Sequence, residues 1–352
     1  MKLLLLYEEV YSYSYSVIGK LESLYNYKIH LVHWGVNESA KSHKNFYNPS
    51  YKVYIKSDNF LRLLNLARKI NPDVVVIPGW NDKSYLGIAL WARKNNKAVV
   101  CTLDTQYTKT LKQVLAKYLG FWIIRKLFYS HIWIPGYPQL YTACKLGFTS
   151  DEMIYDLLSA DSEIFITPNP DLLESKSYQC INFLFVGRLE KEKGVETLIS
   201  AWRVFSKGNK NYNLTIVGSG SLEGDISSLE NISYKGYLDP CGVASLMRNM
   251  DCLILPSYSE PWALVIHEAV LSGMAIICTK ECGASSFFVI DGYNGFLIDK
   301  RNEVSLELAM NSFVNLSIEE KRKFSQRSEK LGKKITTSTS AARFNSFFKS
   351  KV

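Results

Sequence analysis

Residues Ser257–Gly273, with the sequence SYSEPWALVIHEAVLSG, decide how this chain is interpreted. They follow the apolar run CLILP (Cys252–Pro256), which is typical of a buried parallel strand. The pattern predicts a loop that carries Glu260 and then a helix over Ala263–Leu271. A second carboxylate, Glu268, lies about two turns into that helix, and helical side chains tilt back toward the N-terminus. Both carboxylates are therefore expected to face one crevice.

The start of this helix adds hydrogen-bond donors to the crevice. The first turn of a helix has no internal acceptors, so the N–H groups of Trp262, Ala263 and Leu264 are expected to point into it. Carboxylates beside backbone donors suit a ligand that has both sugar hydroxyls and phosphate. The alternative is a pair of solvated glutamates near an ordinary strand-to-helix turn, and this stretch taken alone favours that alternative.

Four further motifs surround this stretch in a fixed order. They are VGRLEKEKG, IVGSG, YKGYL and DGYNGFLI, and with LPSYSEPWALVIHEA they lie within Ile181–Asp299. Their order and spacing resemble the C-terminal domain of glycosyltransferase family 4, a family of retaining, nucleotide-sugar-dependent enzymes with the GT-B fold. One such motif is weak evidence, whereas five in register are specific.

The resemblance implies a role for each matching residue. It places Glu260 beside the transferred sugar and Glu268 at the ribose. The other donor-binding positions are the diphosphate pair Arg188 and Lys193, the base-binding loop at Tyr237 and Leu238, and the helix start at Trp262, Ala263 and Leu264. An arginine grips two phosphate oxygens at once, and a lysine adds a point charge.

Three positions depart from the family pattern. Asp104 stands where the family usually has a histidine beside the transfer centre, and it is interpreted either as a catalytic residue or as the N-cap of a helix over Thr105–Lys117. Pro261 replaces a common glycine and has no N–H to donate. Glu8–Ser16 (EEVYSYSYS) replaces a glycine pair in the first loop. Its hydroxyls are expected either to bind an acceptor or to belong to an edge strand or packed loop.

The N-terminal half alternates short apolar runs with helical patterns, which indicates a doubly wound parallel sheet. The fold class expected for the whole chain is α/β, with two Rossmann-like domains facing across a cleft as in GT-B. The expected divisions are an acceptor-binding domain over residues 1–168, a linker over 169–180, a nucleotide-sugar domain over 181–330 and a basic helix over 331–352 that crosses back to the first domain.

Charge and composition limit the partners. The 352 residues carry a net charge of +9, with ten Lys or Arg against three Glu in Glu319–Val352 and five basic residues and no acid in Lys109–Lys126. Such clusters suggest an anionic membrane surface, although solvated or packed helices explain them equally well. No apolar run reaches the ~18 residues that span a bilayer. The seven cysteines include no CxxC pair and fit a reducing compartment.

The function expected from these observations is metal-independent transfer of a hexose from a nucleotide sugar to a hydroxyl of a glycan or lipid-linked acceptor, with retention, in bacterial capsule or lipopolysaccharide synthesis. No Asp-x-Asp motif, no metal and no cofactor are expected, because the nucleotide sugar is a substrate. The expected location is the cytoplasm, peripherally at the inner face of the cell membrane. The alternatives are a GT-B epimerase or hydrolase, or a basic membrane- or nucleic-acid-binding protein. Only charge favours nucleic acid, so none is expected as a partner.

Overall fold

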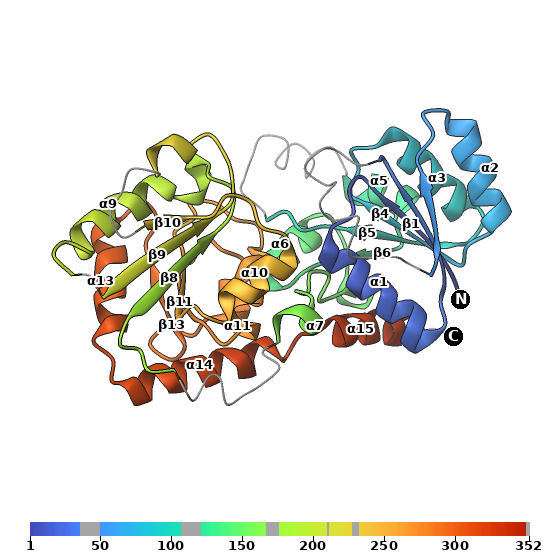
Figure 1. Ribbon diagram of the computed structural model, residues 1–352. Coiled ribbons are helices and arrows are strands. Elements are labelled where there is room, and N and C mark those ends of the chain that lie inside the picture. Colours follow the sequence, from blue (N-terminus) through green and yellow to red (C-terminus); the bar gives the residue numbers. More distant parts are fainter. Residues whose placement is uncertain (36–49, 107–120, 167–175, 210, 227–231, 350–352) are drawn as a thin grey trace. The chain divides into compact units, whose positions relative to one another are not determined.

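The computed structural model describes residues 1–35, 50–106, 121–166, 176–209, 211–226 and 232–349 and divides into two compact units (Figure 1). Unit 1 comprises Met1–Ser159 and Thr337–Val352, and unit 2 comprises Ala160–Thr336. The chain therefore leaves unit 1 once and returns to it with its last helix. Most of the linker predicted over residues 169–180 lies outside the described residues.

Unit 1 is built on a seven-stranded parallel sheet with the order β3-β2-β1-β4-β5-β6-β7. The chain builds the sheet outward from β1, first through β2 and β3 on one side and then through β4 to β7 on the other. The strand order therefore reverses between β1 and β4, which is the topological switch point of this sheet. The strands are β1 (Lys2–Tyr7), β2 (Lys28–His33), β3 (Lys52–Ile55), β4 (Val74–Pro78), β5 (Ala98–Thr102), β6 (His131–Trp133) and β7 (Met153–Ile154).

Helices cover both faces of this sheet, and β1 shows why. Leu3 and Leu5 pack against α1 (Ser12–Tyr25) and α15 (Thr337–Lys349), whereas Leu4 and Leu6 face the opposite cluster. That second cluster takes residues from α2 (Phe60–Ile70), α3 (Lys83–Lys94), α5 (Phe121–Phe128) and α6 (Tyr137–Lys145). A strand buried on both faces reads as a continuous apolar run, which is what LLLL is.

Unit 2 repeats the architecture with a six-stranded parallel sheet, ordered β10-β9-β8-β11-β12-β13. Its strand order reverses between β8 and β11, which is the switch point of this sheet. The strands are β8 (Ile181–Val186), β9 (Tyr212–Val217), β10 (Ile232–Tyr234), β11 (Cys252–Leu255), β12 (Ala275–Thr279) and β13 (Gly295–Ile298). The helices are α7 (Ser162–Phe165), α9 (Val195–Phe205), α10 (Pro240–Met247), α11 (Leu264–Leu271), α12 (Ser285–Phe288), α13 (Glu303–Val314) and α14 (Ile318–Gly332).

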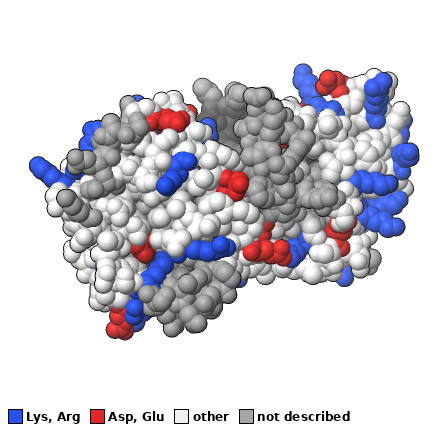
Figure 2. Space-filling view, viewed as in Figure 1, with Lys and Arg blue, Asp and Glu red and all other residues white. Residues whose placement is uncertain are grey.

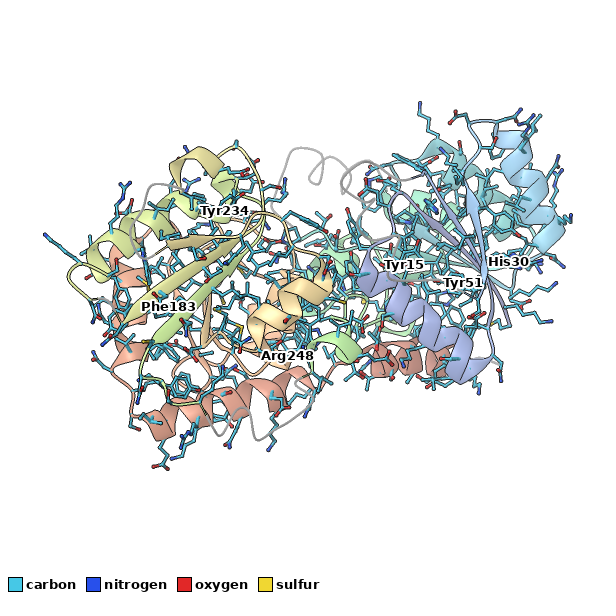
Figure 3. The ribbon with its side chains drawn as sticks, viewed as in Figure 1. Tyr15, His30, Tyr51, Phe183, Tyr234 and Arg248 are labelled. Atoms are coloured by element: carbon cyan, nitrogen blue, oxygen red, sulfur yellow. The ribbon has the colours of Figure 1, made fainter. Side chains whose placement is uncertain are left out.

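The core of unit 2 gathers around Phe183 in the middle of β8 (Figure 3). Its ring lies edge-on to Trp202 and Phe205 of α9 and to Phe313 of α13. The apolar stripe of α9 is buried along its whole length, as expected for a core helix and not for a ligand site. The predicted pair of doubly wound Rossmann-like domains is confirmed in both sheets.

Two helices of unit 1 have well-defined beginnings. Asn59 caps α2, because its side-chain oxygen accepts from the N–H groups of Leu61 and Arg62. In the first loop, α1 begins at Ser12, so the edge-strand alternative for the Tyr–Ser alternation was wrong. The predicted helix over Thr105–Lys117 falls largely on residues 107–120, which lie outside the described residues.

Much of the predicted basic surface is paired within the chain. Lys and Arg side chains are spread among acidic ones on the visible face (Figure 2). In the C-terminal tail, Lys323, Lys333 and Arg343 pair with Glu319, Glu329 and Asp156. Most of Lys109–Lys126 lies outside the described residues. In its described part Arg125 is buried and binds Glu152 at 2.8 Å, which fits the packed-helix alternative at this residue and not the membrane-facing one. No helix in the described ranges is long and apolar enough to cross a membrane.

Candidate functional site

The main candidate site lies at the switch point of unit 2, where the strand order reverses between β8 and β11. In open parallel sheets, ligands bind beyond the carboxyl ends of the strands at this point. The loops after β8, β9 and β11 approach one another closely there. A Cβ on Gly194 would lie 2.0 Å from the carbonyl oxygen of Pro256, and one on Gly218 would lie 1.9 Å from that of Gly187. Both glycines have positive φ, so these loops need glycine for space and for conformation.

Two cations follow β8, and their surroundings differ. Lys193 ends a short 3-10 turn and its ammonium group contacts the Glu260 carboxylate, with each side chain about 15% exposed (16% and 14%). Arg188 is 70% exposed and pairs with Glu192 at 3.0 Å. The structure therefore brings the predicted cation and the predicted catalytic carboxylate together, although they are 67 positions apart in the chain. Arg188 is available from solvent at the same loop.

The loop that carries Glu260 is held against the neighbouring strand connection. Its backbone forms a parallel bridge with Cys282, and the Glu260 carbonyl accepts from the Gly283 N–H at 3.1 Å. Pro261 follows without an N–H to contribute. The carboxylate is thus presented by a fixed backbone.

The helix after this loop begins one residue later than predicted. Ala263 has a left-handed backbone (φ 73°) and forms the N-cap, and α11 starts at Leu264. The backbone N–H groups of Ala263 and Leu264 donate to no acceptor in the described ranges. The Trp262 side chain does not line a site, because it is buried against Phe287 and Phe288. Any role of Trp262 toward a donor is therefore one of its backbone.

Glu268 lies in the second turn of α11 and is half-buried. Burial, with a smaller contribution from the nearby Asp161 carboxylate, raises the pKa of Glu268 to about 7. Asp161 is itself buried and caps α7 by accepting from the Glu163 N–H. Glu268 thus changes charge near neutral pH. No pattern in the sequence predicts that Asp161, which lies 107 positions earlier, is close enough to act on it.

The predicted base-binding loop follows β10. Tyr237 is 49% exposed and Leu238 half-buried. The preceding Gly236 carbonyl accepts from the Gly218 N–H at 2.8 Å, and the Tyr234 hydroxyl donates to the Gly218 carbonyl at 3.0 Å (Figure 3). This loop is therefore joined by backbone contacts to the loop after β9, with an aromatic side chain at its surface.

His267 is a residue that sequence reasoning did not single out. It is fully buried beside Glu268 and stacks on Phe288. Its Nδ1 accepts from the Ala160 N–H at 3.0 Å, and its Nε2 donates to the carbonyl oxygens of Gly332 and Ile335 at 3.1 and 3.0 Å. Burial lowers the pKa of His267 to about 4, so it stays neutral. Its hydrogen bonds join α11 to the first residue of unit 2 and to the segment that follows α14 near the end of unit 2.

The last predicted site residue, Asp104, lies in unit 1. It follows β5 at the carboxyl edge of that sheet, where its carbonyl accepts from the Gln139 amide at 2.8 Å. It also lines a cavity of about 500 Å³ at the switch point of the unit 1 sheet, where the strand order reverses between β1 and β4. No group of three or more potential metal ligands exists among the described residues.

A comparison with known protein families finds a match to residues of unit 2. Residues 179–331 match the model of the family Glycosyl transferases group 1. The matched range lies within unit 2 and covers less than half of the chain. It includes every predicted donor-binding residue, so the residues brought together at the edge of the second sheet lie in the part of the chain that is similar to this family.

Individual relatives match over the same part of the chain. An uncharacterized glycosyltransferase of Methanocaldococcus jannaschii is 31% identical over 141 residues, which are 38% of this chain and 38% of that protein. A capsular polysaccharide biosynthesis glycosyltransferase of Staphylococcus aureus, CapM, is 27% identical over 159 residues, 41% of this chain and 40% of the relative. The chain thus spans about two fifths of the length of these relatives.

The fold as a whole is shared with solved structures. Anabaena HepE, crystallised with UDP, aligns over 99% of this chain and 100% of its own with a TM-score of 0.77 and 16% identity. At this identity the comparison shows the fold alone, which is that of GT-B glycosyltransferases. The expectation that the two domains face across a cleft stays a prediction.

Proposed function

We propose that this chain is a retaining glycosyltransferase that moves a hexosyl group from a nucleotide sugar to a hydroxyl of a glycan or lipid-linked acceptor. The observation that carries the proposal is the contact of Lys193 with Glu260 at the switch point of unit 2. A cation for a leaving diphosphate and a carboxylate for the transferred sugar then lie side by side. The group 1 domain match supports the same assignment.

The chemistry divides among the residues as follows. As the bond between the sugar and the diphosphate breaks, negative charge grows on the leaving phosphate and positive charge on the sugar ring. Lys193, Arg188 and the unpaired N–H groups at the start of α11 stabilise the phosphate. Glu260 stabilises the oxocarbenium-like ring, and Glu268 binds the ribose. These cations take the role that a divalent metal has in other transferases, so turnover is expected to be metal-independent.

A screen followed by a transfer assay tests this function. Thermal shift against UDP, GDP, ADP and their sugars identifies the donor, because a specific ligand stabilises the folded state by mass action. The selected donor is then incubated with glycan acceptors, with and without EDTA. Acceptor-dependent product in EDTA, with the anomeric configuration of the donor, supports the proposal. Turnover without acceptor indicates an epimerase or hydrolase, and loss in EDTA that Mg²⁺ or Mn²⁺ restores overturns the cationic assignment.

We also propose a role in surface polysaccharide synthesis at the inner face of the membrane. The Staphylococcus aureus relative is named for capsular polysaccharide biosynthesis, and the chain carries a net charge of +9. Co-sedimentation with anionic but not neutral vesicles, weakened by salt, is expected. Equal sedimentation with both vesicle types would contradict membrane association through charge.

A further inference from the structure

The chain crosses between the two units at two places, and both crossings are fastened to the same helix of unit 2. The first crossing is at Ser159–Ala160, just before α7, and the second is at Thr336–Thr337, just after α14. Both α7 and α14 contact α11, the helix that carries Glu268 (Figure 1). The helix of the candidate donor site is therefore also the element of unit 2 at which the two crossing segments converge.

The imidazole of His267, one position before Glu268, makes a hydrogen bond to each crossing segment. Its Nδ1 accepts from the Ala160 N–H at 3.0 Å. Its Nε2 donates to the carbonyl oxygens of Gly332 and Ile335 at 3.1 and 3.0 Å. Because a neutral imidazole has one donor and one acceptor nitrogen, a single ring uses both of them to hold the two crossings.

The packing around this ring leaves these contacts little freedom. His267 and Ala160 are completely buried, and the ring stacks on Phe288 with centroids 4.3 Å apart. Ser272, which follows α11, donates to the carbonyl of Phe165 at 3.1 Å, so α11 holds α7 on both of its sides. Buried polar groups are costly to leave without a partner. The two crossing segments and α11 are therefore expected to move together.

We propose that His267 is a positioning residue for the nucleotide sugar, and that through it donor binding in unit 2 is coupled to the backbone mobility of both crossings. The inference rests on the proposed function, which places the ribose at Glu268 and the phosphate at the start of α11. A nucleotide bound there restrains α11, and His267 transmits the restraint to the segments at Ala160 and Ile335. Such coupling is reciprocal, so a ligand of unit 1 that restrains the crossings is expected to strengthen nucleotide binding.

Hydrogen exchange of the full-length wild type, with and without nucleotide, tests this coupling. UDP, GDP and ADP are each titrated first, and the tightest binder is used at saturation. We expect the backbone amides of 160–166 and 332–337 to exchange about threefold more slowly, or slower still, when the nucleotide is bound. Binding that leaves the exchange of both segments unchanged would overturn this inference alone. Absence of binding for all three nucleotides would contradict the proposed function and, with it, this inference.

Conservative variants separate the two hydrogen bonds of His267. Asparagine places an oxygen near the position of Nδ1, whereas glutamine places an N–H near that of Nε2. His267→Asn is therefore expected to keep the nucleotide-induced protection of 160–166 and to lose that of 332–337, and His267→Gln should do the reverse. Each should weaken nucleotide affinity about threefold, and His267→Phe, which keeps only the ring, about tenfold. Wild-type affinity and protection in His267→Phe would overturn the inference.

The matched control is Ser325→Ala. Ser325 is buried in α14 and donates to the carbonyl of Gly273 just after α11, so this change removes a buried hydrogen bond between the same two elements and touches neither crossing. Its nucleotide affinity and its protection of both segments should match the wild type. Urea melts of all four variants identify any difference in overall stability. A loss of affinity in Ser325→Ala as large as in His267→Phe would show that His267 only holds the fold together, and would overturn the inference.

Discussion

The carboxyl edges of the two sheets differ in chemistry although their topology is the same. Both sheets are parallel, and their strand order reverses between β1 and β4 in unit 1 and between β8 and β11 in unit 2. Each sheet has its candidate site at this switch point. In unit 1 the edge carries exposed aromatic rings and three carboxylates. In unit 2 it carries Lys193, Arg188 and close-packed glycine loops. The fold therefore fixes where a ligand binds, and the side chains on the loops decide which chemistry it has.

The largest effect is expected at Glu260. Glu260→Gln keeps the shape and removes the charge, so kcat should fall about 10²-fold or more, as for other electrostatic stabilisers of a transition state. Glu268→Gln should mainly raise KM for the donor, because the ribose does not change during the reaction. Steady-state kinetics with saturating acceptor separate the two. If Glu268→Gln carries the loss of kcat and Glu260→Gln only the change of KM, the two roles are reversed.

A smaller effect is expected from pH. The pKa of Glu268 is about 7, and the ionised carboxylate accepts hydrogen bonds from both ribose hydroxyls more strongly than the protonated acid does. Binding therefore favours the ionised form, and donor affinity should rise about five- to tenfold between pH 6 and pH 8. Glu268→Gln should flatten this dependence. A wild-type affinity that falls over this range, or an unchanged slope in the variant, would show that Glu268 does not contact the donor.

The same shift has a consequence for stability in the absence of ligand. The folded-state pKa of Glu268 is raised above its ordinary value near 4.5, so folding is penalised once the unfolded chain has lost this proton. The Glu268 contribution to the free energy of unfolding should therefore fall as pH rises from about 4.5 to 7 and stay level above. Comparing wild type with Glu268→Gln in urea melts isolates it, and a contribution that grows with pH would contradict the burial of this carboxyl.

The smallest effect is expected at Arg188. Its side chain is 70% exposed and paired with Glu192 on the surface, where charge contacts are weak. Arg188→Gln should lower nucleotide affinity about two- to fivefold at low salt, and the difference should disappear near 1 M salt, where the Debye length is about 3 Å. The matched Glu192→Gln change should leave affinity the same or slightly higher. A loss at Arg188 that persists in high salt would indicate a desolvated contact in the bound state.

Sequence reasoning reached those features that depend on local pattern and chain order. The apolar runs predicted both sheets, and the family resemblance assigned Lys193 and Glu260 to one donor site. Features that depend on distant packing were missed. The approach of Asp161 to Glu268 and the hydrogen bonds of buried His267 join segments with no shared periodicity. The unit 1 cavity draws on loops after several strands, so no single stretch of sequence indicates it.

The most direct test of the contrast between the two edges is calorimetric titration of the nucleoside diphosphate chosen by the thermal-shift screen into four proteins. These are the wild type, Lys193→Met, the control Lys191→Met from the same 3-10 turn, and Trp80→Ala from the unit 1 cavity. Loss of the Lys193 contact should cost about 1.5–3 kcal/mol, a weakening of roughly ten- to 150-fold. Lys191→Met and Trp80→Ala should bind like the wild type. Unchanged affinity in Lys193→Met, or an equal loss in Trp80→Ala, would contradict the assignment of the diphosphate to the edge of unit 2.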